Sequence, residues 1–349
     1  GNSLIRITNI DQSTQRVNQL SLPALDKSYE LQVEFILMSK SAQASFYTTS
    51  QDELATIRKN FTEQKKRYDS SYQDLQQIVS NDPKLKQSSQ EVEQTYKRFA
   101  KSVDNLFKDK QTQLELNNTL RTQLEDIEIS AEDANSVVLD IIDIDGLEEN
   151  HSRAYQAANN MENNFQSVVT NSTDMLTVKT LNTLDIVKNE QVYYLEEVER
   201  SLGLIRPAII ESNADLYNDL NSYVENLVNN VRGNNSLSAN KKRLIDAIAQ
   251  TQAELANAEK STTEALKQLK ELVDQATVLA FDLQQDVSGN VSTATIWTWI
   301  AMVIATLIAI AVAAITVSRI TKPLSEVNRI LDIVASGDMT QRLDDSAKD

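Results

Sequence analysis

The stretch of residues 83–145 reads PKLKQSSQEVEQTYKRFAKSVDNLFKDKQTQLELNNTLRTQLEDIEISAEDANSVVLDIIDID and contains neither glycine nor an internal proline. Apolar residues recur along it three or four positions apart, among them Phe99, Val103 and Leu106, as they do on one face of a helix. A helix rises about 1.5 Å per residue, so this stretch predicts a rod of roughly 90 Å. The other helices of the chain have to pack along this long one.

Turn-forming residues are scarce throughout the chain, which has six glycines and four prolines in 349 residues. A sheet protein needs a tight turn about every ten residues, so this composition predicts an all-α fold. The chain has no cysteine and a single histidine, His151, which excludes a disulfide framework and a histidine-based triad. P-loop, GxSxG and HExxH motifs are absent from the sequence. We therefore expect no enzyme activity, no cofactor and no metal site.

Glycine, proline and cap residues divide the region before residue 296 into six expected helices. Pro23 lies inside the first and is expected to bend it, because the proline ring removes one backbone donor. Ser50 or Asp52 is expected to cap the second helix, and Ser238 the sixth. A joint at residues 203–207 separates the fourth from the fifth. The expected helices are residues 2–47, 50–80, 83–145, 147–202, 207–231 and 238–295.

Helix length predicts the topology of this region. The third and sixth helices are each about twice as long as the second and fifth, so each can contribute to two stacked four-helix bundles. We expect a membrane-proximal module of the first helix, the second half of the third, the fourth, and the second half of the sixth. The distal module would hold the second helix, the first half of the third, the fifth, and the first half of the sixth. One long antiparallel coiled coil is the alternative, and the joint at residues 203–207 argues against it.

Residues 296–317 read IWTWIAMVIATLIAIAVAAITV, an uncharged stretch that is long enough for a transmembrane helix. Trp297 and Trp299 at its start match an outer aromatic belt, and Arg319 and Lys322 after it place the C-terminus in the cytoplasm. About −15 of the formal net charge of −16 lies before this span. The outer region is therefore expected to repel nucleic acid and anionic lipid.

After the span, residues 318–349 resemble the first half of a HAMP domain, the parallel four-helix relay of bacterial receptors. Lys322 and Pro323 open a short amphipathic helix, and Gly337 ends it before a connector that begins with Asp338. The resemblance implies a signal relay in which Pro323 and Gly337 bound the first HAMP helix. It also implies a homodimer, since a parallel HAMP bundle needs two chains. An ordinary juxtamembrane amphipathic helix is the alternative.

The outer region, residues 1–295, resembles the helical bimodular sensor domains of methyl-accepting chemotaxis proteins and of some sensor kinases. The resemblance lies in helix number, relative helix lengths, total size and the segment LSLPAL at residues 20–25. It implies a sensor in the periplasm, on a bacterial inner-membrane receptor that passes a helix displacement through the span to HAMP. The ligand would be a small molecule, such as an organic acid, bound in a bundle core.

Another interpretation keeps the same fold but changes the partner and the output. The region would then be the sensor half of a histidine kinase or a cyclic-di-GMP enzyme. It would read a periplasmic binding protein docked on the distal module, at the turns around residues 81–83 and 233–235. In that case the bundle core would be apolar and free of ligand.

A ligand site in the bundle would place polar residues at positions where an apolar stripe continues. Such positions are Lys40 and Gln43 on the first helix, Asn117 and Arg121 on the third, and Lys179 on the fourth. A buried cation needs an anion, so a paired Lys40 and Arg121 would hold a carboxylate ligand. The planar fork of arginine suits that role. The alternative is that both side chains keep their charged heads in water.

A second group of candidate ligand residues lies on the second helix. Arg58, Lys65, Tyr68 and Tyr72 cluster there. Tyrosines at helical spacing can belong to a ligand cage. Tyrosine rings also bury well, so a role in the core is the alternative for Tyr68 and Tyr72.

Overall fold

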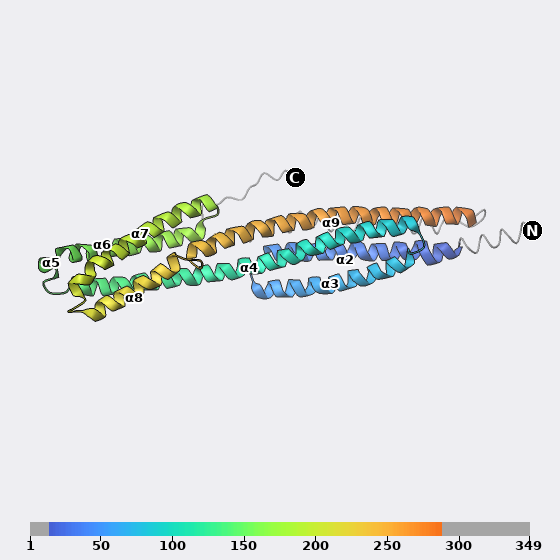
Figure 1. Cartoon of the computed structure of the whole chain (residues 1–349). Helices are drawn as coiled ribbons and strands as arrows, with labels where there is room; N and C mark the ends of the chain where they lie inside the picture. The colour runs from blue at the N-terminus through green and yellow to red at the C-terminus, as the bar shows by residue number, and fades with distance from the viewer. Residues whose placement is uncertain (1–13, 288–349) are drawn as a thin grey trace, which may run out of the picture. The chain divides into compact units, whose positions relative to one another are not determined.

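The computed structural model describes residues 14–287, and every regular element in that range is helical (Figure 1). This confirms the all-α fold. No helix within the described range is both long enough and apolar enough to cross a membrane. The predicted span and HAMP helix, with Trp297, Trp299, Pro323 and Gly337, lie outside the described residues.

The described range contains eight α-helices and one π-helical turn. The longest, α4, has 60 residues and corresponds to the stretch 83–145 that predicted a single rod. The elements are η1 (Val17–Ser21), α2 (Leu22–Tyr47), α3 (Gln51–Ile78), α4 (Pro83–Ile142), α5 (Leu147–Asn150), α6 (Ser152–Thr177), α7 (Leu181–Ile209), α8 (Ala214–Val231) and α9 (Leu237–Val287).

Side-chain caps and one glycine set most of the helix ends that the sequence predicted. The Ser50 hydroxyl accepts a hydrogen bond from the backbone N–H three residues later, at the start of α3. The Asp82 carboxylate accepts two such bonds at the start of α4. Gly146 adopts a positive φ of 77° just after α4, which favours glycine. The cap of α9 differs from the prediction, because Ser236 rather than Ser238 accepts the N–H bond.

A π-helical turn lies directly before Pro23, where the sequence predicted a bend. The chain is helical before Val17–Ser21 and after it, and Pro23 stands at the start of α2. Proline has no N–H to donate, and its ring clashes with the carbonyl four residues back in a regular helix. A wider turn directly before Pro23 accommodates both effects.

The predicted boundaries between the fourth and fifth helices were wrong. The chain leaves the helical conformation at residues 178–180, where the Thr180 hydroxyl accepts from the backbone N–H of Thr183 and caps α7. The expected joint at residues 203–207 does not form, because α7 continues through Pro207 to Ile209. Pro207 is exposed and lies in the last turn of α7, so water can reach the carbonyl that loses its partner.

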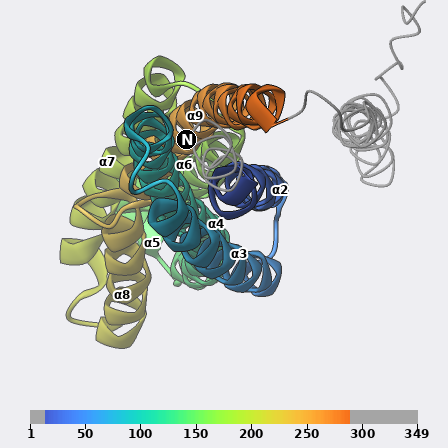
Figure 2. The same cartoon turned by 90° about the vertical axis from the view of Figure 1, so that its right-hand side faces the viewer.

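Two apolar cores divide the described helices into two modules. The first module contains α2, α3, the N-terminal half of α4 and the C-terminal half of α9. The second module contains the C-terminal half of α4, the helices α5 to α8, and the N-terminal half of α9. Both α4 and α9 therefore serve both modules, as their lengths predicted (Figure 1). Figure 2 shows the helices of the bundle end-on.

The predicted assignment of the short helices to modules was wrong. It placed the first and second helices in different modules, whereas α2 and α3 form a hairpin within the first module. The two helices have 26 and 28 residues, so the second returns along the whole length of the first. Arg67 Nε lies 2.7 Å from Glu34 Oε1, and Ser41 Oγ donates to Gln64 Oε1 at 2.9 Å, which ties the hairpin together.

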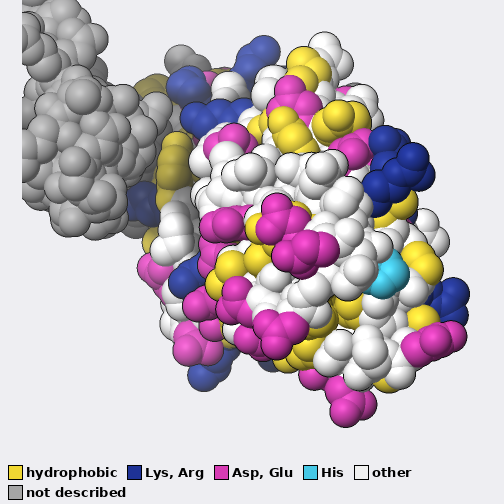
Figure 3. Space-filling model, turned by 90° about the vertical axis from the view of Figure 1, so that its left-hand side faces the viewer, with side chains coloured by type: hydrophobic (Ala, Val, Ile, Leu, Met, Phe, Trp, Pro, Cys, Tyr) yellow, Lys and Arg dark blue, Asp and Glu magenta, His cyan; other side chains and the backbone are white. Residues whose placement is uncertain are grey.

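The two turns that were expected at a distal tip lie elsewhere. The turn at residues 81–83 is near the N-terminal end of the first module, where Asp82 Oδ2 lies 4.0 Å from Arg16 Nη2. The turn at residues 233–235 contacts the middle of α4. The free end of the second module is formed instead by the connections around α5 and between α7 and α8, and Figure 3 shows acidic side chains gathered there.

Candidate functional site

The two apolar cores meet in the middle of α4. The first core ends on this helix at Leu114, and the second begins at Leu120. We call residues 110–123 of α4 the waist. The ends of several shorter helices lie beside the waist, so polar backbone groups are concentrated there.

Lys110 is a buried charged residue at the waist, with 5% of its surface exposed. Its Nζ donates a 2.7 Å hydrogen bond to the backbone oxygen of Phe46, the penultimate residue of α2, and lies 5.9 Å from the centre of the Phe46 ring. The last carbonyls of a helix lack partners within the helix and carry the negative end of its dipole. Burial lowers the pKa of Lys110, because the surroundings disfavour the charged amine.

Lys241 of α9 makes the same kind of contact in the second module. It is 6% exposed, and its Nζ donates to the backbone oxygen of Leu176 at 2.6 Å. Leu176 is the penultimate residue of α6, as Phe46 is of α2. Burial lowers the pKa of Lys241 as well. Each long helix is thus bonded, through one buried lysine, to the end of a helix that belongs to a single module.

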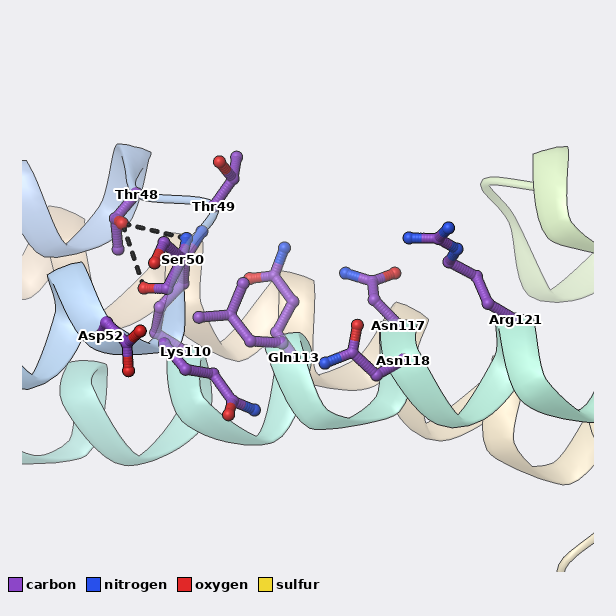
Figure 4. A pocket seen from close by; sticks show the side chains of 11 residues that line it. Thr48, Thr49, Ser50, Asp52, Lys110, Gln113, Asn117, Asn118 and Arg121 are labelled. Carbon is purple, nitrogen blue, oxygen red and sulfur yellow. Dashed lines mark hydrogen bonds between the residues drawn. The ribbon is translucent and has the colours of Figure 1, made fainter.

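A polar groove of about 390 Å³ lies on one side of the waist. Figure 4 shows the side chains of α4 in a row along the helix, with the turn at residues 48–50 at one end and Arg121 at the other. The start of α3 also lines the groove and adds the positive end of a helix dipole. The lining contains two basic residues, Lys110 and Arg121, and one carboxylate, Asp52. The Lys110 amine is engaged by Phe46, so Arg121 is the cation that is exposed to the groove. The groove can therefore accept a small anion.

The structure brings together only some of the residues predicted for a carboxylate site. Asn117 and Arg121 both line the groove, and both are exposed. Lys40 is exposed on α2 and takes no part in the lining, so the predicted pair of Lys40 and Arg121 does not form. Gln43 donates to Glu259 of α9 at 3.4 Å.

Lys179, the remaining candidate for the carboxylate site, lies apart from the groove. It is exposed in the turn between α6 and α7. The sequence placed Lys179 on an apolar stripe because it predicted one continuous helix through this point. The helix α6 ends at Thr177, so the stripe does not reach Lys179.

Tyr68 and Tyr72 belong to the first module, where they pack in or beside its core. Tyr68 is fully buried and stacks on Tyr96 with ring centres 4.0 Å apart, and within the described part its hydroxyl has no hydrogen-bond partner. The Tyr72 hydroxyl donates to Glu93 at 3.2 Å. Burial raises the pKa of both phenols. Arg58 is exposed, so these three residues do not form a ligand cage.

A second groove, of about 500 Å³, lies where the turn between α8 and α9 meets the waist. Its amides are already engaged in holding that turn. Gln123 donates to the backbone oxygen of Asn235 at 2.6 Å, and Asn240 donates to Gln123 at 2.9 Å. Arg243 donates to the backbone oxygen of Asn234 at 2.9 Å. This groove is therefore structural.

No protein-family model matches the sequence, and no curated protein matches it either. Solved structures do match the fold of this chain. The fold is similar to that of the TorS sensor domain. One match is the TorS sensor domain in complex with TorT in the presence of TMAO, with a TM-score of 0.57 and 12% identity. Another is the TorS sensor domain of the V. parahaemolyticus histidine kinase, with a TM-score of 0.51 and 12% identity.

Each comparison covers 72% of this chain and 99% of the TorS sensor domain. The likeness therefore extends over a whole sensor domain. At 12% identity it shows the fold alone. The described part of this chain is thus a two-module helical bundle of the kind found in the TorS sensor.

The buried lysines were absent from the candidate residues predicted from the sequence. A signal for both existed, because each stands where an apolar residue would continue a stripe. Lys110 lies between Phe107 and Leu114, and Lys241 lies between Leu237 and Leu244. What the sequence did not show is that a helix ends opposite each lysine. Among the described residues no group of three or more acidic or histidine side chains is placed to hold a metal.

Proposed function

We propose that this chain is the sensor and membrane-spanning part of a bacterial signalling receptor that reads a binding protein docked on its surface. The observation that carries the proposal is the two-module fold with shared helices α4 and α9, which is similar to the TorS sensor solved in complex with TorT. The stretch 296–317, with the length and composition of a span, follows α9 closely along the chain.

The packing of the two modules supports a docked partner over a ligand inside the bundle. Large apolar side chains fill both cores, including Phe35 and Phe99 in the first and Met161 and Phe165 in the second. Each groove at the waist touches a core through one leucine, Leu114 in the first groove and Leu116 in the second. A small anion in the first groove, held by Arg121 and Asn117, is a second candidate, because Arg121 is an exposed cation there in a strongly acidic chain.

In this proposal α9 is the element that carries the signal. A docked partner changes the second module, and α9, which also lines the first module, passes a small displacement toward residues 296–317 and the HAMP helix between Pro323 and Gly337. The receptor is a homodimer in the inner membrane, with the sensor in the periplasm and the C-terminus in the cytoplasm. The chain itself catalyses nothing. Its output part is a histidine kinase, a cyclic-di-GMP enzyme or a methyl-accepting chemotaxis domain.

A thermal-shift screen of the whole chain in detergent tests this proposal. The panel contains organic acids, amino acids and polyamines at matched pH. A ligand that binds the folded state raises the melting temperature by mass action. We expect no specific shift, because the partner that binds is a protein. A saturable shift with one small molecule would instead support direct sensing.

A further inference from the structure

The outer face of α7 carries apolar side chains that no described helix covers. Ile186 is 60% exposed, Tyr193 56% and Leu204 45%. Tyr193 follows Ile186 by 7 residues, and Leu204 follows Tyr193 by 11. These are about two and three full turns of about 3.6 residues, so all three side chains lie on one line along the helix. At about 1.5 Å per residue the line is roughly 27 Å long. We call these three residues the α7 stripe.

Packing within the second module does not explain the α7 stripe. The opposite face of α7, with Leu195 and Val198, is the one that is buried against its neighbours. Gly203 directly precedes Leu204 and so faces about a quarter turn away from the stripe. It is exposed in the interior of the helix, and a Cβ there would meet nothing within 4 Å. Glycine weakens a helix relative to alanine, so Gly203 does not serve the fold either. Both features suit the close approach of another surface.

We infer that the α7 stripe is the docking surface for the partner protein, an inference that rests on the proposed function. Within about a quarter turn of the stripe, α7 carries three carboxylates, Glu190, Glu196 and Glu197, and one basic residue, Arg200. Arg232 lies 3.5 Å from Glu196 and adds one more positive charge, so the borders of the stripe are acidic on balance. The partner that fits is a protein with an apolar contact surface and a rim of lysine and arginine.

A second copy of this chain fits the stripe less well. Two receptors in one membrane run parallel, so a contact between their α7 helices would bring equal residues together. Arg200, which lies between Tyr193 and Leu204 along the stripe, would then face Arg200 of the second copy. Like charges in such a contact are unfavourable. In the single chain Arg200 is paired with Glu197 at 3.2 Å.

Photo-crosslinking in intact cells tests the surface. The full-length receptor is produced in its own host with p-benzoylphenylalanine at Ile186 or at Tyr193. Lys188, which is exposed on another face of α7, is the matched control position. We expect a covalent product with a different protein from both stripe positions and none from Lys188.

Binding measurements with the captured protein complete the test. The protein is purified and titrated against the whole chain. We expect Ile186→Glu and Tyr193→Glu to weaken binding at least about tenfold. Lys188→Gln should leave it within about twofold. Gly203→Ala should weaken binding while raising the melting temperature by about 2 °C, a combination that a purely structural role would not give.

Several results would overturn the inference. These are a product that joins two copies of the chain, a product within one chain, or equal products from Lys188 and the stripe. The crosslinker is also placed at Ile129 and at Leu139, which are exposed apolar residues of α4. A product only from these two positions would leave the docked-partner function standing and remove α7 as its surface. No product with another protein at any of these positions would contradict both the α7 surface and the docked-partner function.

Discussion

Replacing Lys241 with methionine tests the bond between α9 and the end of α6. Methionine retains most of the lysine stem but removes the amine that donates to the backbone oxygen of Leu176 at 2.6 Å. That oxygen then lies near a helix end without its buried donor. Lys242, the next residue, is exposed and provides a matched control.

The expected magnitude follows from three effects. Losing a hydrogen bond from a charged donor costs about 1.5–3 kcal/mol. Removing a positive charge from a helix C-terminus costs about 0.5 kcal/mol more. Relief from burying the charge offsets part of this, since burial already lowers the pKa of Lys241. We therefore expect Lys241→Met to lower the free energy of unfolding by about 1–2 kcal/mol, and Lys242→Met to change it by less than about 0.5 kcal/mol.

Urea denaturation followed by circular dichroism measures both variants at pH 7 and at alkaline pH. The pKa of Lys241 is lower in the folded state, so the unfolded state binds more protons between the folded pKa and the ordinary lysine pKa. The stability of the wild type should therefore rise with pH in that window relative to Lys241→Met. Equal stability of the two methionine variants, or a difference that does not grow with pH, would refute the reasoning.

Two further predictions concern the first module and the end of α4, and urea denaturation measures both. Tyr68→Phe removes a buried hydroxyl without a described partner, so the free energy of unfolding should stay unchanged or rise by up to about 1 kcal/mol. Tyr96→Phe loses the 2.8 Å hydrogen bond to Asp69, so the free energy of unfolding should fall by about 1 kcal/mol. The reverse order of the two variants would contradict this. Gly146→Ala forces alanine to a φ of 77° and should lower stability by about 1–2 kcal/mol, so an unchanged urea midpoint would count against the turn.

The long helices could be predicted because they depend on local features. A stretch without glycine or internal proline continues as a helix, and Asp82 and Gly146 mark its two ends. The sharing of α4 and α9 between two cores followed from length alone. The break at residues 178–180 was missed because it contains neither glycine nor proline, and only the Thr180 cap encodes it.

The candidate carboxylate site was only partly predictable, because it depends on the level at which helices lie beside each other. Phe46 of α2 and Lys110 of α4 are in contact and so mark one level. Both helices run toward the waist, so Lys40 lies about 9 Å before that level and Arg121 about 16 Å beyond it. A separation of roughly 25 Å along the bundle keeps the two cations apart, although each stood at a plausible position on its own stripe.

Calorimetric titration tests most directly the central claim, that this sensor reads a docked protein rather than a small molecule. The whole chain in detergent is titrated with the organic acids of the screen, alongside Arg121→Ala and the exposed control Lys40→Ala, which lies outside the groove. The account predicts no saturable heat of binding for the wild type, for Arg121→Ala or for Lys40→Ala. Saturable binding to the wild type and to Lys40→Ala that Arg121→Ala abolishes would contradict it and place direct sensing in the groove at the waist.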